Sequence, residues 1–290
     1  MDKFCVITNI EKDKDYTITG KINDFLKNAG KSCVIMGDQP ISNGITDMYT
    51  DVEKIPEDIE CAIVLGGDGT MIQAANDLVN MDIPILGVNI GTLGFLTEVE
   101  KHEIENALHR LIADDYFIES RMMLSGSVKE GEKELYHGYA LNDFVVTKRG
   151  ICRIITIKVY VNDILQDIYR GDGLIVSTPT GSTGYNLSAG GPVLAPDMNC
   201  ISITPICPHS FNNRSLVIAA TDRLRIKIGQ TKEMQEDEAV LTVDGNKVID
   251  LITEKQVDIA MSKTNTKLIK LTKSRFFERM REKLNGSNRI

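Results

Sequence analysis

The chain has 290 residues, of which 42% are hydrophobic and 26% are charged, and it carries a formal net charge of −8 at pH 7. This length predicts about two domains, and this composition is typical of a globular protein with a hydrophobic core rather than of a disordered chain. The acidic balance leaves no surplus of Lys and Arg for a basic patch, which argues against nucleic acids and anionic membranes as partners.

The sequence also indicates a compartment. No apolar run approaches the roughly 18–20 residues that a membrane-spanning helix needs, and the N-terminal residues lack the architecture of a cleavable signal. The six cysteines are scattered without a C-x-x-C pair, and the four histidines show no paired metal-ligand spacing. We therefore expect a cytoplasmic protein without a disulfide framework, a zinc site or a membrane anchor.

The first third of the chain alternates between strand and helix patterns. Strand, helix and strand in this order, with short links, predict a parallel α/β sheet with right-handed crossovers. The predicted elements are a strand at Phe4–Thr8, a helix at Ile18–Asn28, strands at Ser32–Met36 and Cys61–Leu65, a helix at Thr70–Val79, a strand at Ile83–Val88 and a helix at Glu103–Ile112.

The pattern changes near residue 116. From Phe117 to about Ile269 the segments are shorter, rich in Val, Ile and Thr, and alternate with a period of two, as in Thr156–Val161 and Val240–Val243. This region predicts a β-sandwich, and Ser274–Leu284 predicts a closing helix with Ser274 as its N-cap. We therefore predict an N-terminal α/β domain at residues 1–116, a C-terminal β domain at 117–271, and a final helix at 272–290 that packs back on the first domain.

Two glycine-rich segments contain candidate ligand-binding residues. The first comprises Gly66, Gly67, Asp68, Gly69 and Thr70, between a buried strand and a helix, which is where open α/β sheets bind ligands. Glycines allow a phosphate to approach the backbone, and the N–H groups of a helix N-terminus favour anions. The alternative is a tight turn that Asp68 caps. Beside a phosphate, Asp68 would hold a divalent cation or act as a general base.

The second segment lies within the predicted β domain. Residues 171–173 and 177–192 combine glycines, hydroxyl side chains and the aromatic Tyr185. Such a surface suits hydrogen bonding to a nucleotide and stacking on its base. A long Ser/Thr/Gly loop without a ligand is the competing interpretation.

Five motifs follow one another along the chain. They are Gly66–Thr70, Gly87–Glu98, the pair Asn142-Asp143, Gly171–Pro192 and Pro205–Ser210. Together, and in this order, they resemble the NAD kinase family. The Gly-Gly-Asp-Gly motif alone is shared with phosphofructokinases and lipid kinases, so the resemblance implies a similar N-terminal fold, whereas the block at 171–192 is more selective.

The resemblance implies an enzyme that phosphorylates the 2′-hydroxyl of the adenosine ribose of NAD and so produces NADP. It implies ATP, or polyphosphate in some members, as the donor, and a divalent cation such as Mg²⁺ whose ligands it does not name. It also implies a homo-oligomer, either a tetramer or a dimer.

The resemblance also assigns roles to individual residues. Asp68 matches the catalytic acid of the family, and many members carry Glu where this chain has Asp143. The phosphate loop for ATP would comprise Gly66, Gly67, Gly69 and Thr70. The NAD-binding residues would be Asp68, Gly69, Asn142, Asp143, Arg153, Arg170, Asp172, Thr183, Gly184, Tyr185, Asn186, Ser188 and Asn246, of which Arg153 and Arg170 fall where the family places residues often contributed across a subunit interface.

Two other functions are compatible with parts of the sequence. A kinase of the same superfamily that acts on a sugar phosphate or a lipid would share the Gly-Gly-Asp-Gly motif, but the second glycine-rich block argues against it. A non-catalytic sensor of NAD or NADP would keep the dinucleotide loop, but it would not need Asp68.

Overall fold

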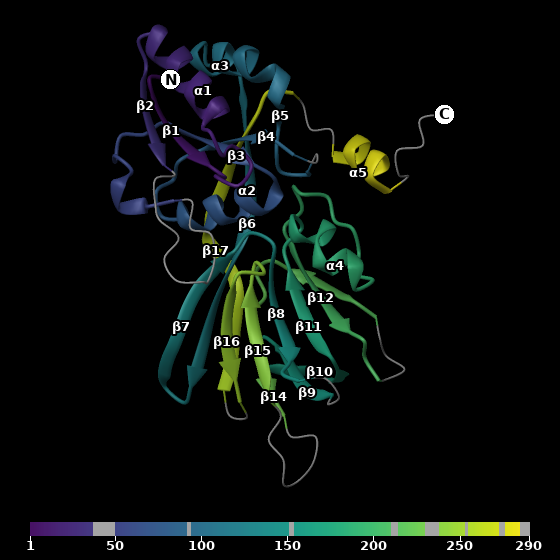
Figure 1. Cartoon of the computed structure of the whole chain (residues 1–290). Helices are drawn as coiled ribbons and strands as arrows, with labels where there is room; N and C mark the ends of the chain where they lie inside the picture. The colour runs from purple at the N-terminus through teal and green to yellow at the C-terminus, as the bar shows by residue number, and fades with distance from the viewer. Residues whose placement is uncertain are drawn as a thin grey trace. The chain divides into compact units, whose positions relative to one another are not determined.

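The computed structural model describes residues 1–36, 50–91, 94–150, 154–209, 214–229, 238–252, 255–272 and 276–284. The chain divides into two compact units, drawn in Figure 1. Unit 1 comprises Met1–Ser120 and Thr266–Ile290, and unit 2 comprises Arg121–Asn265. Each unit has its own hydrophobic core.

Unit 1 is built on a parallel sheet. Its strands are β2 (Ser32–Met36), β1 (Lys3–Thr8), β3 (Cys61–Gly66) and β4 (Ile85–Asn89), in that spatial order. β3 is buried at all six positions, which explains its continuous apolar sequence. Next to β4 lie β5 (Val99–Glu100) and the last residues of β17 (Lys255–Lys270), where Leu268 pairs with Ile85.

Helices cover both faces of this sheet (Figure 1). The chain steps from β1 to β2 in one direction and from β3 to β4 in the other, so right-handed crossovers place α1 (Thr17–Asn28) and α2 (Asp68–Asp77) on opposite faces. α3 (Ile104–Ile112) packs beside α1, and Leu26 and Leu108 share one core with the sheet. The unit also contains α5 (Phe276–Leu284) and two 3₁₀ turns, Val52–Lys54 and Lys101–Glu103.

The predicted strands and helices of unit 1 are confirmed, but the bounds of β4 and α2 differ from the prediction by two residues. β4 begins at Ile85 rather than at Ile83, and α2 ends at Asp77 rather than at Val79. α2 begins at Asp68, two residues before the expected start at Thr70. Gly67 is the N-cap, with φ −127° and ψ −165°, so Asp68 occupies the first helical position, where a carboxylate interacts favourably with the helix dipole. The expected cap of α5, Ser274, lies outside the described residues.

Unit 2 contains two sheets of mainly antiparallel strands. One has the order β13 (Leu216–Ala219), β12 (Cys200–Ile206), β11 (Gly173–Ser177), β8 (Asp143–Lys148), β15 (Ala239–Val243) and β16 (Lys247–Leu251). The other contains β10 (Ile164–Gly171), β9 (Ile155–Val161), β14 (Leu224–Ile228), β17, β6 (Phe117–Glu130) and β7 (Lys133–Ala140).

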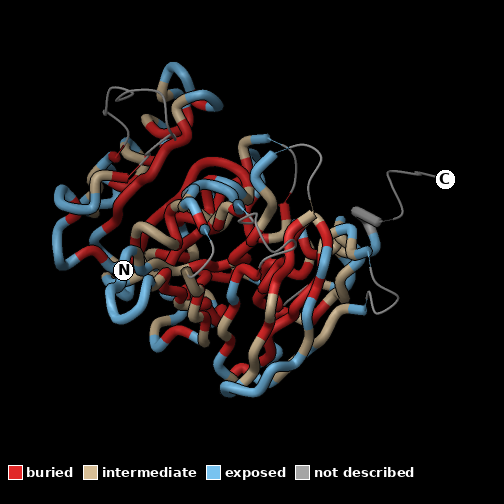
Figure 2. Tube along the Cα trace, turned by 90° about the horizontal axis from the view of Figure 1, so that it is seen from below, coloured by how far each residue is buried: buried red, intermediate tan, exposed pale blue. Residues whose placement is uncertain are grey.

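The two sheets of unit 2 pack face to face and enclose one core. Phe144 and Leu174 come from the first sheet, and Ile157 and Ile226 come from the second, and all four are nearly fully buried. Figure 2 shows the buried segments inside and the exposed residues mainly at turns and edges. The predicted β-sandwich is confirmed. After β11, the 3₁₀ turn Gly181–Thr183 leads into the short helix α4 (Tyr185–Ser188).

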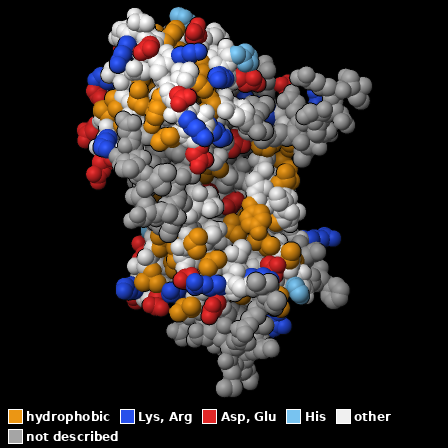
Figure 3. Space-filling model, viewed as in Figure 1, with side chains coloured by type: hydrophobic (Ala, Val, Ile, Leu, Met, Phe, Trp, Pro, Cys, Tyr) orange, Lys and Arg blue, Asp and Glu red, His pale blue; other side chains and the backbone are white. Residues whose placement is uncertain are grey.

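The surface carries mixed charge. On the face drawn in Figure 3, Lys and Arg side chains are interspersed with Asp and Glu, so the described residues of this face form no single basic surface. Within the described part of the chain, no helix combines the length and the apolar character that a membrane span requires.

A buried carboxylate fastens the end of β17 to unit 1. The side chain of Glu98 is 6% exposed, and its Oε1 accepts hydrogen bonds from the backbone N–H groups of Leu271 (3.1 Å) and Thr272 (3.2 Å). Its Oε2 lies 3.3 Å from Lys270 Nζ and 3.5 Å from an Arg279 guanidinium nitrogen. Glu98 therefore compensates two cations and satisfies two backbone donors at once.

We predict that Glu98→Gln lowers the free energy of unfolding by roughly 3 kcal/mol, because it weakens the charge compensation of two largely buried cations. Urea titration followed by circular dichroism measures this loss. Glu57→Gln, the same change at an exposed position, is the control and should stay within about 0.5 kcal/mol of the native chain. Equal effects of the two substitutions would contradict the assignment.

Candidate functional site

The strand order of unit 1 reverses between β1 and β3. β1 is followed by β2 on one side, and β3 is followed by β4 on the other, so the carboxyl ends of β1 and β3 are neighbours. Parallel α/β sheets bind ligands outside the carboxyl ends of the strands at such a switch point. The loops that leave β1, β3 and β4 all begin at this edge of the sheet.

Asp68 is fixed at this edge by the loop after β4. Its Oδ2 accepts the backbone N–H of Phe95 at 2.8 Å, and its Oδ1 accepts that of Leu96 at 3.0 Å. A Cβ on Gly94 would lie 1.8 Å from Asp68 Oδ1, so only glycine allows this close approach. Each carboxylate oxygen keeps a second lone pair for a ligand. Asp68 is half-buried and oriented, which suits a group that must contact a substrate.

The other predicted phosphate-loop residues divide into two groups. Gly66 and Thr70 are buried, and a Cβ on Gly66 would collide with the Thr70 side chain. Thr70 Oγ1 accepts a hydrogen bond from Asn9 Nδ2 at 3.1 Å, which links the loop to the end of β1. Gly67 is the buried N-cap of α2, whereas Gly69 is exposed. The structure therefore assigns packing to Gly66 and Thr70 and leaves Asp68 and Gly69 accessible.

Sequence reasoning missed Lys12, which lies in the loop after β1. A Cβ on Gly67 would lie 3.1 Å from Lys12 Nζ, and one on Gly91 would lie 3.2 Å from it. The ammonium group thus lies against glycines of two different loops. The signal available in the sequence was weak, because it was one lysine among several charged residues that follow a strand.

In unit 2, an aspartate holds the corner that contains Asn142 and Asp143. The Asp244 carboxylate accepts the backbone N–H groups of Leu141 (2.8 Å), Asn142 (2.8 Å) and Asp143 (2.9 Å). Asp244 is not among the site residues predicted from the sequence. Its position before Gly245, in a strand-turn-strand pattern, was the one available signal.

Asp143 itself is 5% exposed, and no described residue hydrogen-bonds to its carboxyl group. Burial and then the nearby charge of Asp244 raise the pKa of Asp143 from 3.8 to about 7. Near neutral pH, Asp143 therefore exists in both protonation states. It can donate a hydrogen bond to a ligand or accept one.

The loop after β11 lies against the same corner. The Asn142 carbonyl accepts the backbone N–H of Thr178 at 2.8 Å, and a Cβ on Gly181 would lie 2.3 Å from that oxygen. A Cβ on Gly184 would lie 3.6 Å from Asn142 Nδ2. The structure thus brings Asn142 together with the predicted residue Gly184.

α4 presents its four residues differently. Asn186 is fully buried, and its amide bonds to the Pro192 carbonyl (3.0 Å) and the Thr204 hydroxyl (2.7 Å), so its side chain anchors the helix. Tyr185 is 47% exposed, and Ser188 is also exposed. A large aromatic ring that reaches solvent from an anchored helix is available for stacking on a ligand.

The remaining predicted residues lie elsewhere. Asp172 precedes β11, at the end opposite to Ser177 and Asn142, and its carboxylate lies 2.6 Å from Lys148 Nζ. The exposed Arg170 is close by at the end of β10. Asn246 is exposed in the turn between β15 and β16, two residues after Asp244. Arg153 lies outside the described residues.

Both parts of the chain match one family. Residues 4–116 match the sequence model of the ATP-NAD kinase N-terminal domain, and residues 141–271 match that of the ATP-NAD kinase C-terminal domain. The chain belongs to the NAD kinase family. A relative from Lachnoclostridium phytofermentans, named NAD kinase, is 47% identical over 285 residues, which are 98% of this chain and 99% of the relative.

Solved structures of NAD kinases and NADH kinases share the fold. Yeast NADH kinase complexed with NADH superposes with a TM-score of 0.84 at 22% identity, covering 100% of this chain and 89% of that one. The NAD kinase from Archaeoglobus fulgidus in complex with ATP gives a TM-score of 0.77 at 24% identity, covering 98% of both chains.

The described residues place no three His, Cys, Asp or Glu side chains close enough together to hold a metal ion between them. Binding of Mg²⁺ does not require such a cluster, because this ion usually binds through one or two carboxylates together with substrate phosphates. Asp68, with free lone pairs beside the glycine loop, fits that kind of binding.

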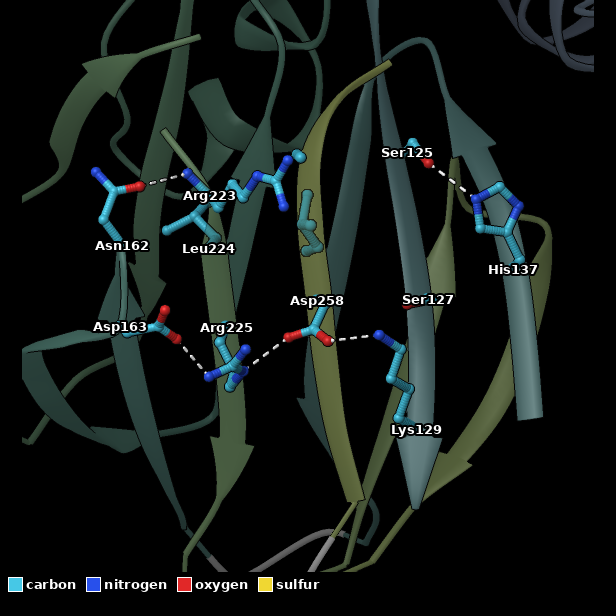
Figure 4. A pocket seen from close by; sticks show the side chains of 12 residues that line it. Ser125, Ser127, Lys129, His137, Asn162, Asp163, Arg223, Leu224, Arg225 and Asp258 are labelled. Carbon is cyan, nitrogen blue, oxygen red and sulfur yellow. Dashed lines mark hydrogen bonds and ion pairs between the residues drawn. The ribbon is translucent and has the colours of Figure 1, made fainter. Parts of the chain in front are cut away.

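Unit 2 also has a hollow away from the motifs shared with NAD kinases (Figure 4). Arg225 pairs there with Asp163 (2.5 Å) and Asp258 (2.9 Å), and Asp258 also pairs with Lys129 (3.2 Å). These charges largely compensate one another and connect the β9–β10 turn with β14, β17 and β6. We interpret this network as a tie between strands.

The raised pKa of Asp143 predicts a pH dependence of stability. Between pH 3.8 and about 7 the folded chain holds a proton that the unfolded chain releases, so Asp143 makes the native chain less stable as the pH rises through this interval. Asp143→Asn cannot ionise, so its free energy of unfolding, relative to the native chain, should increase from pH 4 to pH 7 by on the order of 4 kcal/mol.

Urea titrations at several pH values measure this difference. Asp197→Asn removes an exposed carboxyl group from the same unit and is the control for the loss of one charge. The prediction would be contradicted if the difference in the free energy of unfolding between Asp143→Asn and the native chain were constant from pH 4 to pH 7.

Proposed function

We propose that the chain transfers the terminal phosphoryl group of ATP to the 2′-hydroxyl of the adenosine ribose of NAD, giving NADP. The observation that carries this proposal is the oriented Asp68 carboxylate, held by the Phe95 and Leu96 N–H groups at the switch point beside the glycine loop. Membership of the NAD kinase family supports the identity of the substrates.

Asp68 acts in this mechanism as the residue that orients the hydroxyl and accepts its proton. A carboxyl group has an ordinary pKa of about 3.9, so it is far too weak a base to deprotonate an alcohol before attack. The proton passes to Asp68 as the new bond to phosphorus forms, while the bond from that phosphorus to the bridging oxygen breaks and ADP leaves. Phosphoryl transfer depends mainly on position and charge neutralisation, and the glycine-loop N–H groups supply part of both.

NAD binding is proposed for the corner of unit 2. Asn142 and Asp143 would hold the ribose and adenine side, and the Asp143 carboxyl can donate or accept because its pKa lies near 7. The Tyr185 ring would stack on a base, with the backbone of Thr183, Gly184 and Ser188 beside it. Asn186 would hold this loop in place without contacting the ligand through its side chain, since that side chain is buried. Asn246 is proposed as a further polar contact.

We propose that a second copy of the chain completes the site. Asp172 and Asn142 flank opposite ends of β11, whose five residues span about 17 Å and are buried on both faces. A ligand cannot lie along such a strand within one chain. Asp172 and Arg170 would therefore contact NAD bound to the neighbouring copy, as would Arg153, in a homo-oligomer such as a dimer or tetramer.

We also propose a divalent cation and a cytoplasmic location. Asp68 and the phosphate oxygens of ATP would hold Mg²⁺, which neutralises phosphate charge when it is bound. Five cysteines are free in the described residues, which fits a reducing compartment.

The test is NADP formation from NAD and ATP with Mg²⁺, with Asp68→Asn beside the native chain. Asn keeps the size of the side chain but cannot take the proton, so kcat should fall about 10²- to 10⁴-fold while NAD binding changes little. Circular dichroism checks that the variant folds. Near-native kcat would refute the proton-accepting role, and no NADP from the native chain with ATP would refute the proposed reaction.

A further inference from the structure

The loops after β1, β3 and β4 contribute different groups that could bind an anion. The loop after β3 contributes Gly67, and the loop after β4 contributes Gly91, and neither residue has a side chain. The loop after β1 contributes a cation, because the Lys12 ammonium group lies against both glycines. A positive charge therefore lies beside two glycine backbones, of which that of Gly91 is exposed.

Within the described part of the chain, no carboxylate pairs with the Lys12 ammonium group. The Lys12 side chain is exposed and makes no ion pair or hydrogen bond with the described residues. The next residue, Asp13, is buried, and its carboxylate accepts the backbone N–H groups of Ile18 (3.1 Å) and Thr19 (2.9 Å) at the start of α1. An ammonium group in this position is available to a ligand.

The backbone that carries Lys12 is held on both sides. The Asn9 carbonyl accepts the N–H groups of Lys12 (3.0 Å) and Asp13 (3.1 Å), and the Asp13 carboxylate fastens the chain to α1. Gly91 is fixed in turn, because its N–H donates to Asn89 Oδ1 at 3.1 Å. The flexible side chain of Lys12 can therefore change its conformation and bind an anion while the backbone of the loop stays in place.

The type of ligand follows from the chemistry of these groups. Backbone N–H groups at a helix N-terminus together with a lysine ammonium group form a typical phosphate site, in which lysine acts as a point charge. Gly67 directly precedes Asp68, the residue proposed to receive the proton. The proposed dinucleotide residues Asn142 and Tyr185 belong to unit 2. Because Gly67 belongs to the predicted phosphate loop for ATP, we assign the phosphates beside Lys12 to the donor.

We infer that Lys12 is a donor-binding residue that contacts the phosphate chain of the nucleoside triphosphate. This inference rests on the proposed function and adds to it a residue that the Gly-Gly-Asp-Gly motif does not contain. Lys12 draws the triphosphate against Gly67 and Gly91 and so places the terminal phosphoryl group near Asp68.

The kinetic test compares the native chain with Lys12→Met, which keeps the stem and removes the charge. We expect kcat/KM for ATP to fall about 10- to 100-fold, because a hydrogen bond to a charged group is lost, while KM for NAD changes less than threefold. Lys12→Arg should restore most of the loss. Lys14→Met, at an exposed lysine of the same loop, is the matched control and should behave like the native chain.

Titration calorimetry with inorganic pyrophosphate provides a readout without turnover. Pyrophosphate should bind the native chain and Lys14→Met alike, and Lys12→Met at least tenfold more weakly. Equal affinities in all three chains, or no binding in any, would overturn the inference. So would an unchanged kcat/KM for ATP in Lys12→Met, or a rise in KM for NAD alone.

The two proposals can fail separately. If the native chain forms no NADP, the proposed reaction fails, and the pyrophosphate titration still decides whether Lys12 binds phosphate. If the native chain is active and Lys12→Met matches it, only the role of Lys12 fails.

Discussion

The reversal of strand order between β1 and β3 is the constraint on which the chemistry of unit 1 depends. It places the loops that contain Lys12, Gly67 and Gly91 at one edge of the sheet, although Lys12 is more than fifty positions away from either glycine in the sequence. α2 starts at this edge and directs its N-terminus outward. The Lys12 ammonium group, the backbone of Gly67 and Gly91 and the Asp68 carboxylate thus lie at the same edge of the sheet.

Carboxylates that accept backbone N–H groups recur throughout the chain. Asp13 fastens the start of α1, Asp68 the loop at 95–96, Glu98 the residues after β17, and Asp244 the corner before β8. Irregular segments have N–H groups without a partner in a helix or sheet, and a charged acceptor satisfies two or three of them together. One cost is visible at Asp143, whose pKa rises because it is buried beside Asp244.

The sequence was sufficient for the order of elements and for the motif loops, because these depend on local signals. Apolar runs such as Cys61–Leu65 and glycine pairs such as Gly66-Gly67 have few alternative interpretations. It was not sufficient for Lys12 or Asp244, whose roles arise from contacts between loops distant in sequence. Asn186 shows a third limit, since a motif indicates that a residue matters but not whether its side chain points to ligand or core.

Contacts from α5 to the loop at 95–97 form only after the C-terminal residues have been synthesised. Phe95, whose N–H holds Asp68, packs near Phe276 with ring centroids 6.2 Å apart, and Arg279 donates to the Thr97 carbonyl at 2.6 Å. The loop that orients Asp68 is thus supported by residues translated almost two hundred positions later. A ribosome adds about 5–20 residues per second, so the nascent N-terminal unit waits about ten seconds or more for this support. A truncated product that lacks α5 therefore keeps the Gly-Gly-Asp-Gly motif but loses the contacts of Phe276 and Arg279 with the loop that orients Asp68.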